Sequence, residues 1–558
     1  MRRYFEENIL ALSDRDPALC NRISRAKTGV LRYRMLDSRS GETVPALLDG
    51  KGASHPLHSL VDPRREGTRL INLAKDEGFL IFLGLGGGFQ VAAALERADI
   101  QKVLVIDYDI YGIAQLLDSR DYHRFFQDTR FHLLIDPSAP QVERYVLDNY
   151  QPVLAGGMRV LPLRTRTVFD RQRFAEAGAA VDRAISTISR DYSVQAYFGT
   201  RWFSNIIRNL LRAEQQDGPI PSIRRAAISA AGPSLDLQLP RLAEKRNDFF
   251  LIATDTSISS LFHAGLEPDA VISIDCQHIS YYHFMPGLPD RVPLYLDLAS
   301  PPLVASFSSH PRFFSGGHPF TRYISRYWRP LPLLDTSGGN VTYAALSLAD
   351  MLGAEQVALY GADFSYPLGR AYSRGTYLFP YFAARQNRLS PLETLFSGFL
   401  FRSPELVKVN REEHWYYENP TLREYRKLLE EKTGNIRALV VPVKGLGAPL
   451  ALREQQAPPP HTIRLFAPGG SSVRAADFLF EYGEKLRNLP KVAQSAWAYL
   501  RRLTSEESLL LATLLPGAVA IKRRNPGLKT AELLEETVTY YTREIEKVLN
   551  SRQPPAVP

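Results

Sequence analysis

The strongest constraint on the fold is an alternation of short apolar segments and helix-like segments that occurs in two separate runs. The first run, residues 78–109, reads as an apolar segment, a glycine turn, a helix and a second apolar segment. The second run begins near residue 226 and repeats the alternation as far as residue 363. Because such alternation is typical of parallel sheets covered by helices, we predict an α/β protein with two Rossmann-like, doubly wound domains.

Helical periodicity and prolines set the other predicted boundaries. Residues 165–215 place apolar side chains at helical spacing and are predicted to connect the two domains. Pro458, Pro459 and Pro460 cannot continue a helix or a central strand, so we expect an all-helical C-terminal domain after them. The predicted parts are an N-terminal Rossmann-like domain with a short strand-rich start (1–164), a helical connection (165–215), a central Rossmann-like domain (216–455) and a helical C-terminal domain (456–558).

Composition excludes several classes of protein. The 558 residues are 45% hydrophobic and 23% charged, as in globular proteins. No uncharged apolar segment reaches membrane-spanning length, and the first ten residues contain charges where a signal peptide is apolar, so we expect a cytoplasmic protein with no membrane partner. Cys20 and Cys276 are too few for a disulfide framework. The net charge of +9 is scattered, and without a nucleic-acid motif it favours acidic ligands or partners over nucleic acid.

The glycine turn of the first run is a candidate nucleotide site. Gly84, Gly86 and Gly88 follow an apolar segment, and Asp107 ends the next apolar segment. Glycines let a ligand approach the backbone, and a carboxylate about 20 residues later can bond a ribose hydroxyl. The spacing resembles that of S-adenosylmethionine-dependent methyltransferases. The alternative is that the glycines serve only the close packing of strand and helix.

The second run opens with another turn, formed by Gly232, Pro233 and Ser234. Ligands of open parallel sheets bind beyond the carboxyl ends of the strands. Gly232 permits close approach, Pro233 suits the first helical position, and Ser234 can donate to a phosphate at the positive end of the helix. The turn is therefore a candidate anion site, with a plain strand-to-helix turn as the alternative.

Other predicted strand ends of the same domain also carry polar or small residues. Because the ends of one sheet converge, we expect these residues to line one crevice, although each aspartate is equally suited to cap the next helix. The glycine turn among them lacks the lysine of a P-loop, so γ-phosphoryl transfer by the ATPase plan is not supported. The candidate residues are Asp255, Ser257, Asp275, Ser337, Gly338, Gly339, Asn340, Thr342 and Asp363.

Residues 229–275 and 337–367 resemble the two signature stretches of the central domain of the motility accessory factor (Maf) family of flagellin glycosyltransferases. "LHSLVDPRREG" and "LGLGGGF" resemble pieces of that family's N-terminal domain, so the resemblance extends over most of residues 1–450. It implies a Rossmann-like central domain similar to bacterial sialyltransferases. The implied activity transfers a nonulosonic acid of the pseudaminic or legionaminic type from a CMP-sugar to serine or threonine of flagellin, with no further cofactor.

The resemblance also implies roles for individual residues. The Gly232 turn would hold the phosphate or nucleotide of the donor, Asp255 would lie near cytidine and ribose, and the turn 337–340 would line the same pocket. Where the family often has a histidine, this chain has Tyr372, which could donate to the leaving phosphate. The catalytic candidates are Tyr372, Asp275 and Asp363, with Arg370 or Arg374 to neutralise the phosphate and His278 or His283 as substitute bases.

Three other functions remain open at this point. The central signature is similar to the archaeal-type 6-hydroxymethylpterin diphosphokinase, which would use ATP and magnesium held by Asp255, Asp275 and Asp363. The missing histidine is compatible with a non-catalytic flagellin-binding accessory protein. The first glycine turn would suit a methyltransferase.

Overall fold

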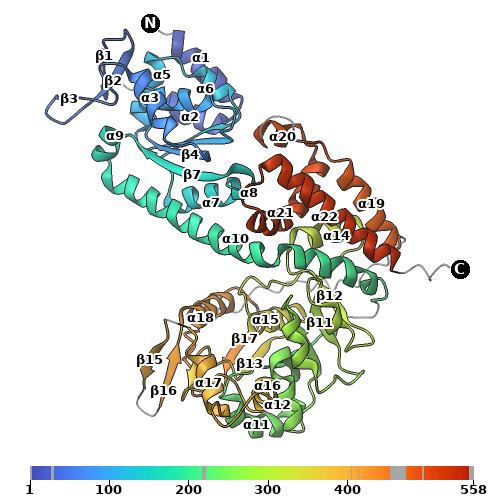
Figure 1. The fold of residues 1–558 in the computed structure, drawn as a ribbon. Helices are drawn as coiled ribbons and strands as arrows, with labels where there is room; N and C mark the ends of the chain where they lie inside the picture. The colour runs from blue at the N-terminus through green and yellow to red at the C-terminus, as the bar shows by residue number, and fades with distance from the viewer. Residues whose placement is uncertain are drawn as a thin grey trace, which may run out of the picture. The chain divides into compact units, whose positions relative to one another are not determined.

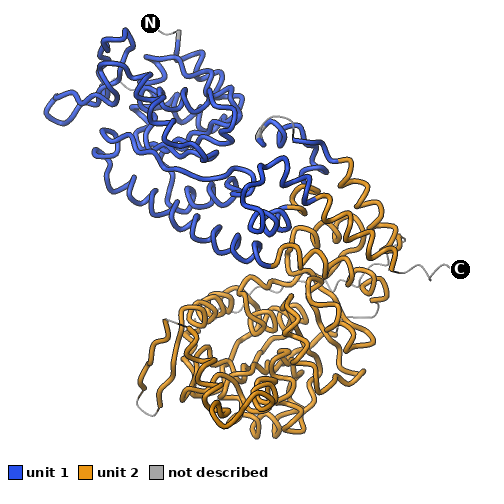
Figure 2. Tube along the Cα trace, viewed as in Figure 1, with its two compact units in different colours: residues 1–197, 489–508, 515–537 blue, residues 198–488, 509–514, 538–558 orange. Residues whose placement is uncertain are grey.

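The computed structural model describes residues 3–26, 31–216, 221–403, 405–411, 414–452, 473–492 and 496–551. The chain forms two compact units, which are coloured separately in Figure 2. Unit 1 contains residues 1–197, 489–508 and 515–537, and unit 2 contains residues 198–488, 509–514 and 538–558. The predicted boundary at Pro458 to Pro460 lies outside the described residues.

Unit 1 is built on a parallel four-stranded sheet in the order β6-β5-β4-β7. Alternate residues of its strands enter two different apolar clusters: Leu80 and Phe82 join one, whereas Phe79 and Ile81 join the other. This period of two is expected of a sheet that is covered on both faces. The strands are β4 (Glu77–Leu83), β5 (Lys102–Asp107), β6 (Phe131–Ile135) and β7 (Gly157–Pro162).

Helices cover both faces of this sheet (Figure 1). They are α3 (Pro63–Asn72), α4 (Phe89–Leu95), α5 (Ile110–Ser119), α6 (His123–Gln127), α7 (Ala139–Asn149), α8 (Pro152–Ala155), α9 (Arg164–Phe169) and the start of α10 (Arg171–Ala213). The long α10 occupies most of the segment that we predicted to be a helical connection.

The start of the chain is more helical than the sequence suggested. Two helices, α1 (Arg3–Ser13) and α2 (Pro17–Arg25), precede an antiparallel sheet of β1 (Tyr33–Asp37), β2 (Thr43–Leu48) and β3 (Ser54–Pro56). Asp16 caps α2 by accepting a hydrogen bond from the Leu19 amide, and Leu19 and Ile23 are buried on one face of that helix. A cap followed by an i, i+4 apolar pair is sufficient for a short amphipathic helix.

Unit 2 is built on a parallel seven-stranded sheet in the order β12-β11-β10-β9-β8-β13-β17. The strand order reverses between β8 and β13, so the sheet is doubly wound and the predicted α/β class is confirmed. The strands are β8 (Arg225–Ser229), β9 (Phe250–Thr254), β10 (Ala270–Ser273), β11 (Leu294–Asp297), β12 (Arg312–Phe314), β13 (Gln356–Tyr360) and β17 (Leu439–Pro442).

Short helices and a small antiparallel sheet complete the Rossmann-like part of unit 2. The small sheet has the order β14-β16-β15, with β14 (Tyr366–Pro367), β15 (Val407–Asn410) and β16 (Trp415–Glu418). The helices are α11 (Leu235–Glu244), η1 (Arg246–Asp248), η2 (Asp255–Ser257), α12 (Ile258–His263), η3 (His278–Phe284), α13 (Pro302–Ala305), α14 (Pro319–Tyr327), α15 (Val341–Met351), α16 (Leu378–Ala383), α17 (Leu392–Leu400) and α18 (Pro420–Thr433).

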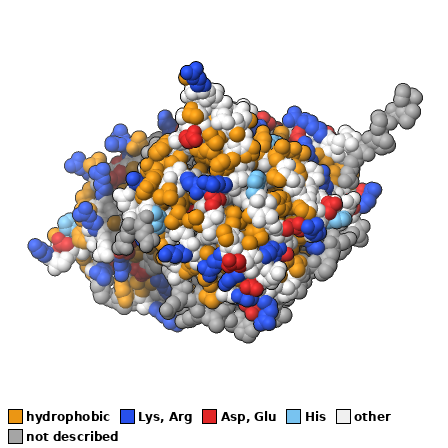
Figure 3. Space-filling view, turned by 90° about the horizontal axis from the view of Figure 1, so that it is seen from below, with side chains coloured by type: hydrophobic (Ala, Val, Ile, Leu, Met, Phe, Trp, Pro, Cys, Tyr) orange, Lys and Arg blue, Asp and Glu red, His pale blue; other side chains and the backbone are white. Residues whose placement is uncertain are grey.

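The C-terminal region is helical, as predicted. Its helices are α19 (Ala475–Arg487), α20 (Ala496–Arg502), α21 (Ser505–Arg524) and α22 (Thr530–Asn550). Thr504 and Glu507 form the capping box at the start of α21 that their spacing predicts. Among the residues that the structure describes, no helix combines the length and the apolar character needed to span a bilayer. On the face seen in Figure 3, basic and acidic side chains are scattered among apolar ones.

Candidate functional site

The ends of β8 and β13 meet at the point where the strand order reverses. The Gly232 amide donates to the Gly361 carbonyl at 2.9 Å, and the Gln238 side chain accepts a hydrogen bond from the Gly361 amide at 2.7 Å. A Cβ atom on Gly232 would collide with the Gly361 carbonyl and the Asp363 carboxylate. Glycine is therefore required here for the close approach of the two strand ends.

Ser234 is the N-cap residue of α11, and both of its polar groups already have protein partners. Its amide donates to Asp363 Oδ2 at 2.8 Å, and its hydroxyl accepts a hydrogen bond from the Leu446 amide at 2.7 Å. The side chain is 0% exposed. The anion at this helix end is thus the carboxylate of Asp363, in the place where we expected a ligand phosphate. Burial raises the pKa of Asp363, and the bonds from Ser234 oppose that shift.

Two further carboxylates follow the neighbouring strands β9 and β10. Asp255 is buried at the start of η2, where its Oδ2 accepts a hydrogen bond from the Ser273 hydroxyl at 2.6 Å and its Oδ1 accepts one from the Thr256 amide. Asp275 accepts a hydrogen bond from the Gln277 amide. Burial raises the pKa of Asp275, and the negative charge of Asp255 contributes to the shift. The two carboxylates therefore share one low-dielectric region.

The charges of Asp255 and of one arginine, Arg402, both act on two tyrosine side chains. Burial raises the pKa of Tyr372 and Tyr377, and the negative charge of Asp255 adds to both shifts. The positive charge of Arg402 has the opposite effect on both tyrosines, so the guanidinium belongs to the same cluster. With their pKa values raised, both phenols keep their protons at neutral pH, so each hydroxyl is able to donate a hydrogen bond.

Two aromatic side chains of η3 pack against Tyr377, the residue that precedes α16. The rings of His283 and Tyr377 lie 4.6 Å apart in an edge-on arrangement, and Tyr282 stacks on Tyr377 with a centroid distance of 6.1 Å. His283 also faces the charge of Asp275, since the histidine opposes the upward shift of the Asp275 pKa. His278, the other histidine candidate, is exposed at the start of η3.

The turn before α15 packs against Tyr425, on which the charge of Asp275 acts. A Cβ atom on Gly339, whose φ is +67°, would lie 3.2 Å from the Tyr425 ring, and the charge of Asp275 contributes to the raised pKa of Tyr425. Gly338 is packed flat against Tyr343, where any Cβ atom would collide with the ring. Asn340 caps α15 by accepting a hydrogen bond from the Tyr343 amide.

Asp335 holds this turn in place. Its carboxylate accepts hydrogen bonds from the Tyr343 hydroxyl at 2.8 Å, from Lys432 Nζ at 2.7 Å and from the Ser337 amide at 3.0 Å. These bonds hold the pKa of Asp335 well below its usual range despite its partial burial. The turn is therefore held in place by a permanently charged carboxylate.

Tyr372 lies in the loop between β14 and α16, and this loop contacts the residues that follow β8. The Ser373 amide donates to the Ala231 carbonyl at 2.9 Å, and the Ser373 hydroxyl pairs with Ser260 at 2.9 Å. The next residue, Arg374, donates its amide to Asp236, which also forms an ion pair with Arg370. The loop thus connects the Ser234 turn with the carboxylate cluster.

The structure brings together most of the predicted residues of the central domain, in two groups. The first group contains Gly232, Pro233, Ser234 and Asp363 at the strand reversal, with Arg370 and Arg374 beside it. The second group contains Asp255, Asp275, Tyr372, His283 and the turn 337–340. Ser257 and Thr342 are buried, and the Ser257 hydroxyl donates to the Ser229 carbonyl, which makes it a structural contact.

Sequence reasoning missed three residues that interact with members of the second group: Arg402, Tyr377 and Tyr425. All three lie outside the strand ends, on segments that only the tertiary fold brings to the crevice. Among the residues that the structure describes, no three His, Cys, Asp or Glu side chains are arranged to hold a metal ion.

In unit 1, the protein's own side chains fill the glycine turn. Asp107 accepts a hydrogen bond from the Leu85 amide at 3.0 Å and forms a buried ion pair with Arg166 at 2.9 Å. His58 accepts a hydrogen bond from the Gly87 amide at 2.8 Å. Cβ atoms on Gly84, Gly86 and Gly88 would collide with Arg166, His58 and Phe125, respectively. The close packing that we gave as the alternative explains these glycines, and the place of a nucleotide ribose is taken by Arg166.

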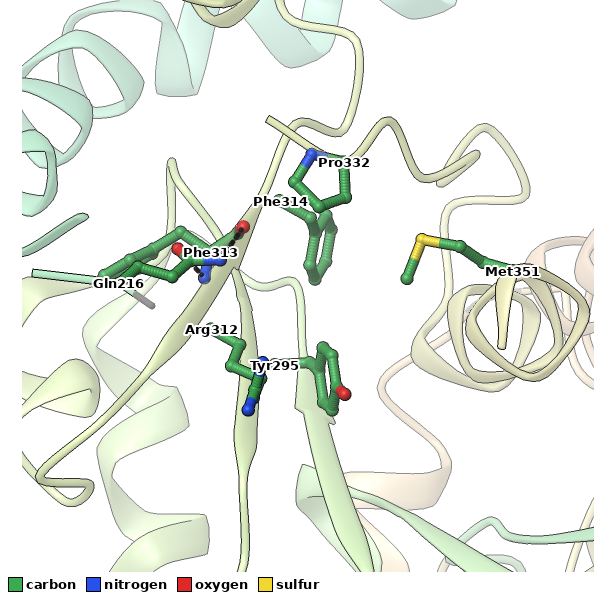
Figure 4. A pocket seen from close by; sticks show the side chains of 7 residues that line it. All are labelled: Gln216, Tyr295, Arg312, Phe313, Phe314, Pro332 and Met351. Carbon is green, nitrogen blue, oxygen red and sulfur yellow. Dashed lines mark hydrogen bonds between the residues drawn. The ribbon is translucent and has the colours of Figure 1, made fainter. Parts of the chain in front are cut away.

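Figure 4 shows a small cavity in unit 2 that is not part of the candidate site. Its volume is about 10 Å³, and Tyr295, Arg312, Phe314 and Met351 are among its lining residues. The cavity lies along β11 and β12 and is large enough for no more than one water molecule. It is therefore excluded as a substrate site.

Comparison with known proteins finds a family that resembles the region of the candidate site. A family model described as "6-hydroxymethylpterin diphosphokinase MptE-like" matches residues 202–369, which include β8 to β14. This part of the chain is similar to MptE-like proteins. Most residues of the two groups lie within the matched region. Six site residues follow it in the sequence: Arg370, Tyr372, Arg374, Tyr377, Arg402 and Tyr425.

Curated relatives come from Treponema pallidum (strain Nichols), and each is called an uncharacterized protein. One is 39% identical over 159 residues, which are 28% of this chain and 56% of the relative. Another is 32% identical over 166 residues, which are 28% of this chain and 78% of the relative. The chain belongs to the same family as this second protein, whereas it spans only about half of the first.

A solved structure shares the fold over nearly the whole chain. It is titled "Structure of MAf glycosyltransferase from Magnetospirillum magneticum AMB-1" and matches with a TM-score of 0.57 at 14% identity, covering 98% of this chain and 95% of that one. The resemblance to the Maf family is therefore confirmed at the level of the fold. The region similar to MptE-like proteins lies in this chain within a Maf-like fold.

Proposed function

We propose that this protein is a glycosyltransferase that transfers a nonulosonic acid from a CMP-sugar to serine or threonine hydroxyls of flagellin in the cytoplasm. One observation carries the proposal: Asp255, Asp275, Tyr372 and the Gly339 turn converge at the carboxyl ends of one parallel sheet. Ligands of doubly wound sheets bind at these ends. The Maf-like fold of the chain supports the choice of glycosyl transfer.

In the proposed reaction, the bond between the anomeric carbon and the CMP phosphate breaks, and both of its electrons leave with the phosphate. Tyr372, which keeps its proton, donates a hydrogen bond to the departing phosphate oxygen. Arg374 and Arg402 are both exposed near this loop and supply positive charge. These groups stabilise charge that grows in the transition state, which is where such interactions accelerate a reaction.

The acceptor hydroxyl forms the new bond to the anomeric carbon and gives its proton to Asp275. A carboxylate with a raised pKa is a better base than an ordinary one, and burial together with Asp255 raises the pKa of Asp275. The charge of His283 opposes this shift. We assign Asp255 and the turn 337–340 to the sugar and nucleotide of the donor.

The test is to incubate purified protein with flagellin and CMP-pseudaminate or CMP-legionaminate and to measure the mass of intact flagellin. We expect an increase by one or more sugar residues, and no increase with the Asp275→Asn variant. Folded wild-type protein that modifies flagellin with none of these donors or other CMP-sugars would contradict the proposal.

The family model favours a second candidate, 6-hydroxymethylpterin diphosphokinase activity. In that case Asp255 and Asp275 would hold magnesium and the protein would release AMP from ATP. Formation of AMP that depends on both the pterin and magnesium would identify this activity, and its absence would leave glycosyl transfer as the remaining proposal.

A further inference from the structure

A cavity of about 350 Å³ opens in unit 1 at the carboxyl ends of β4 and β7. Its volume is at the lower end of the range for small-molecule binding sites. The lining residues are Leu83, Pro162, Thr167, Val168, Arg171, Phe174 and Ala175. They come from the two strand ends, from α9 and from the first turn of α10, which follow β7 directly (Figure 1).

The topology of unit 1 independently points to the same place. In the order β6-β5-β4-β7, the chain moves outward from β4 to β6 and then returns to the other side of β4. The strand order therefore reverses between β4 and β7, and ligand crevices of open parallel sheets lie at such a reversal. Leu83 ends β4 and Pro162 ends β7, so the cavity coincides with this position.

The base of the cavity is apolar and well supported. Phe174 is buried, packs edge-on against Tyr108 at 5.1 Å, and lies under the Arg166 guanidinium at 5.3 Å. The charge of Arg166 is already balanced by ion pairs with Asp107 and Asp170. These contacts leave an apolar surface of fixed shape for the body of a ligand.

The mouth of the cavity combines an apolar residue with a positive charge. Val168 is 71% exposed and adds apolar surface at the mouth. Arg171 is exposed and lines the cavity, and no ion pair or hydrogen bond of its side chain is found among the residues that the structure describes. A free guanidinium at the mouth is a fitting partner for a carboxylate, sulfonate or phosphate group.

We propose that this cavity binds a small amphipathic anion, with an apolar body against Leu83 and Phe174 and an acidic group paired with Arg171. The lining of this site does not include the glycine turn of unit 1, whose glycines pack against His58, Arg166 and Phe125. The site is also independent of the proposed glycosyl transfer, since all of its residues belong to unit 1.

The experiment titrates the full chain with 8-anilinonaphthalene-1-sulfonate and measures fluorescence. We expect saturable binding by the wild type and at least tenfold weaker binding by Ala175→Trp, whose indole fills the mouth of the cavity. Ala175→Ser is the matched control and keeps the wild-type affinity. Ala175 is exposed on α10, and a thermal unfolding curve checks that each variant is folded.

A second comparison tests the charge. Arg171→Gln is expected to bind the sulfonate about fivefold more weakly, as the loss of one exposed ion pair predicts, whereas Arg164→Gln binds normally. The uncharged analogue N-phenyl-1-naphthylamine is expected to bind the wild type and Arg171→Gln equally. Sulfonate binding that is absent from the wild type, or equal in the wild type, Ala175→Trp and Arg171→Gln, would overturn the proposal.

Discussion

At the scale of single residues, the environment of Asp275 determines what it can do. Burial and the negative charge of Asp255 both raise its pKa, so Asp275 is protonated at a higher pH than an ordinary aspartate. As a base it works only when it is deprotonated. We therefore expect kcat to fall as pH decreases through the raised pKa of Asp275, and to fall about a hundredfold or more in Asp275→Asn.

Asp255 allows a second test of the pH dependence that we assign to Asp275. Asp255→Asn removes the negative charge that raises the pKa of Asp275, so the acidic limb of the kcat profile is expected to move to lower pH. The quantity to measure is the pH at which kcat falls to half of its maximum, and a change in the maximal rate does not affect this reading. An unmoved limb would show that another group, such as His283, controls the profile.

Tyr372 is proposed to donate a hydrogen bond, whereas Asp275 is proposed to accept a proton, and this role of Tyr372 can be tested separately. Because burial raises its pKa, the phenol remains protonated at neutral pH, and the proposed reaction uses it as a hydrogen-bond donor. Tyr372→Phe is expected to lower kcat by about two orders of magnitude with little change in donor KM, as for other donors to a developing anion. Tyr417→Phe, on β16, is the control and keeps wild-type kinetics. Equal kinetics of Tyr372→Phe and wild type would exclude the assigned role.

At the scale of elements, the turn before α15 depends on its glycines. A Cβ atom on Gly338 would collide with the Tyr343 ring, which donates its hydroxyl to Asp335. Gly338→Ala is expected to destabilise unit 2 by about 1 to 3 kcal/mol and to raise donor KM, because the ring and the turn must both shift. Thermal unfolding and donor titration measure the two effects.

The matched control is Gly398→Ala in α17. Nothing lies within 4 Å of a Cβ atom at Gly398, and alanine is the better helix former, so this variant is expected to be about 0.5 to 1 kcal/mol more stable than the wild type. A Gly338→Ala protein as stable as Gly398→Ala would contradict the packing described for the turn.

The sheets of both units could be predicted from the sequence, whereas some contacts of the candidate site could not. The parallel sheets were predictable because strand and helix periods alternate, and the meeting of Asp255 with Asp275 follows from their places after adjacent strands. The partner of the Ser234 amide was not predictable, because a ligand phosphate and the Asp363 carboxylate meet the same need at a helix end. Arg402 escaped notice because the fold brings it to the crevice from beyond α17.

At the scale of the whole molecule, the chain is basic. The sequence has 68 Lys and Arg against 59 Asp and Glu, which gives a net charge of +9. A CMP-nonulosonate carries a phosphodiester and a carboxylate, so the proposed donor is an anion. A positive molecule raises the encounter rate with an anionic ligand, and dissolved salt screens this attraction over a Debye length of about 10 Å at 0.1 M.

Salt dependence of the steady-state kinetics therefore tests the proposed donor at this scale. Between about 20 mM and 300 mM sodium chloride, we expect kcat/KM for the CMP-sugar to fall severalfold while kcat changes little, because screening weakens association and leaves the bound complex intact. Thermal unfolding at each salt concentration controls for changes in folding. The triple variant Arg34→Gln, Arg39→Gln and Lys51→Gln removes three exposed positive charges in unit 1 and is expected to reduce the salt dependence without abolishing it. A kcat/KM that is constant across the salt range would mean that the net charge of the molecule does not serve the capture of an anionic donor.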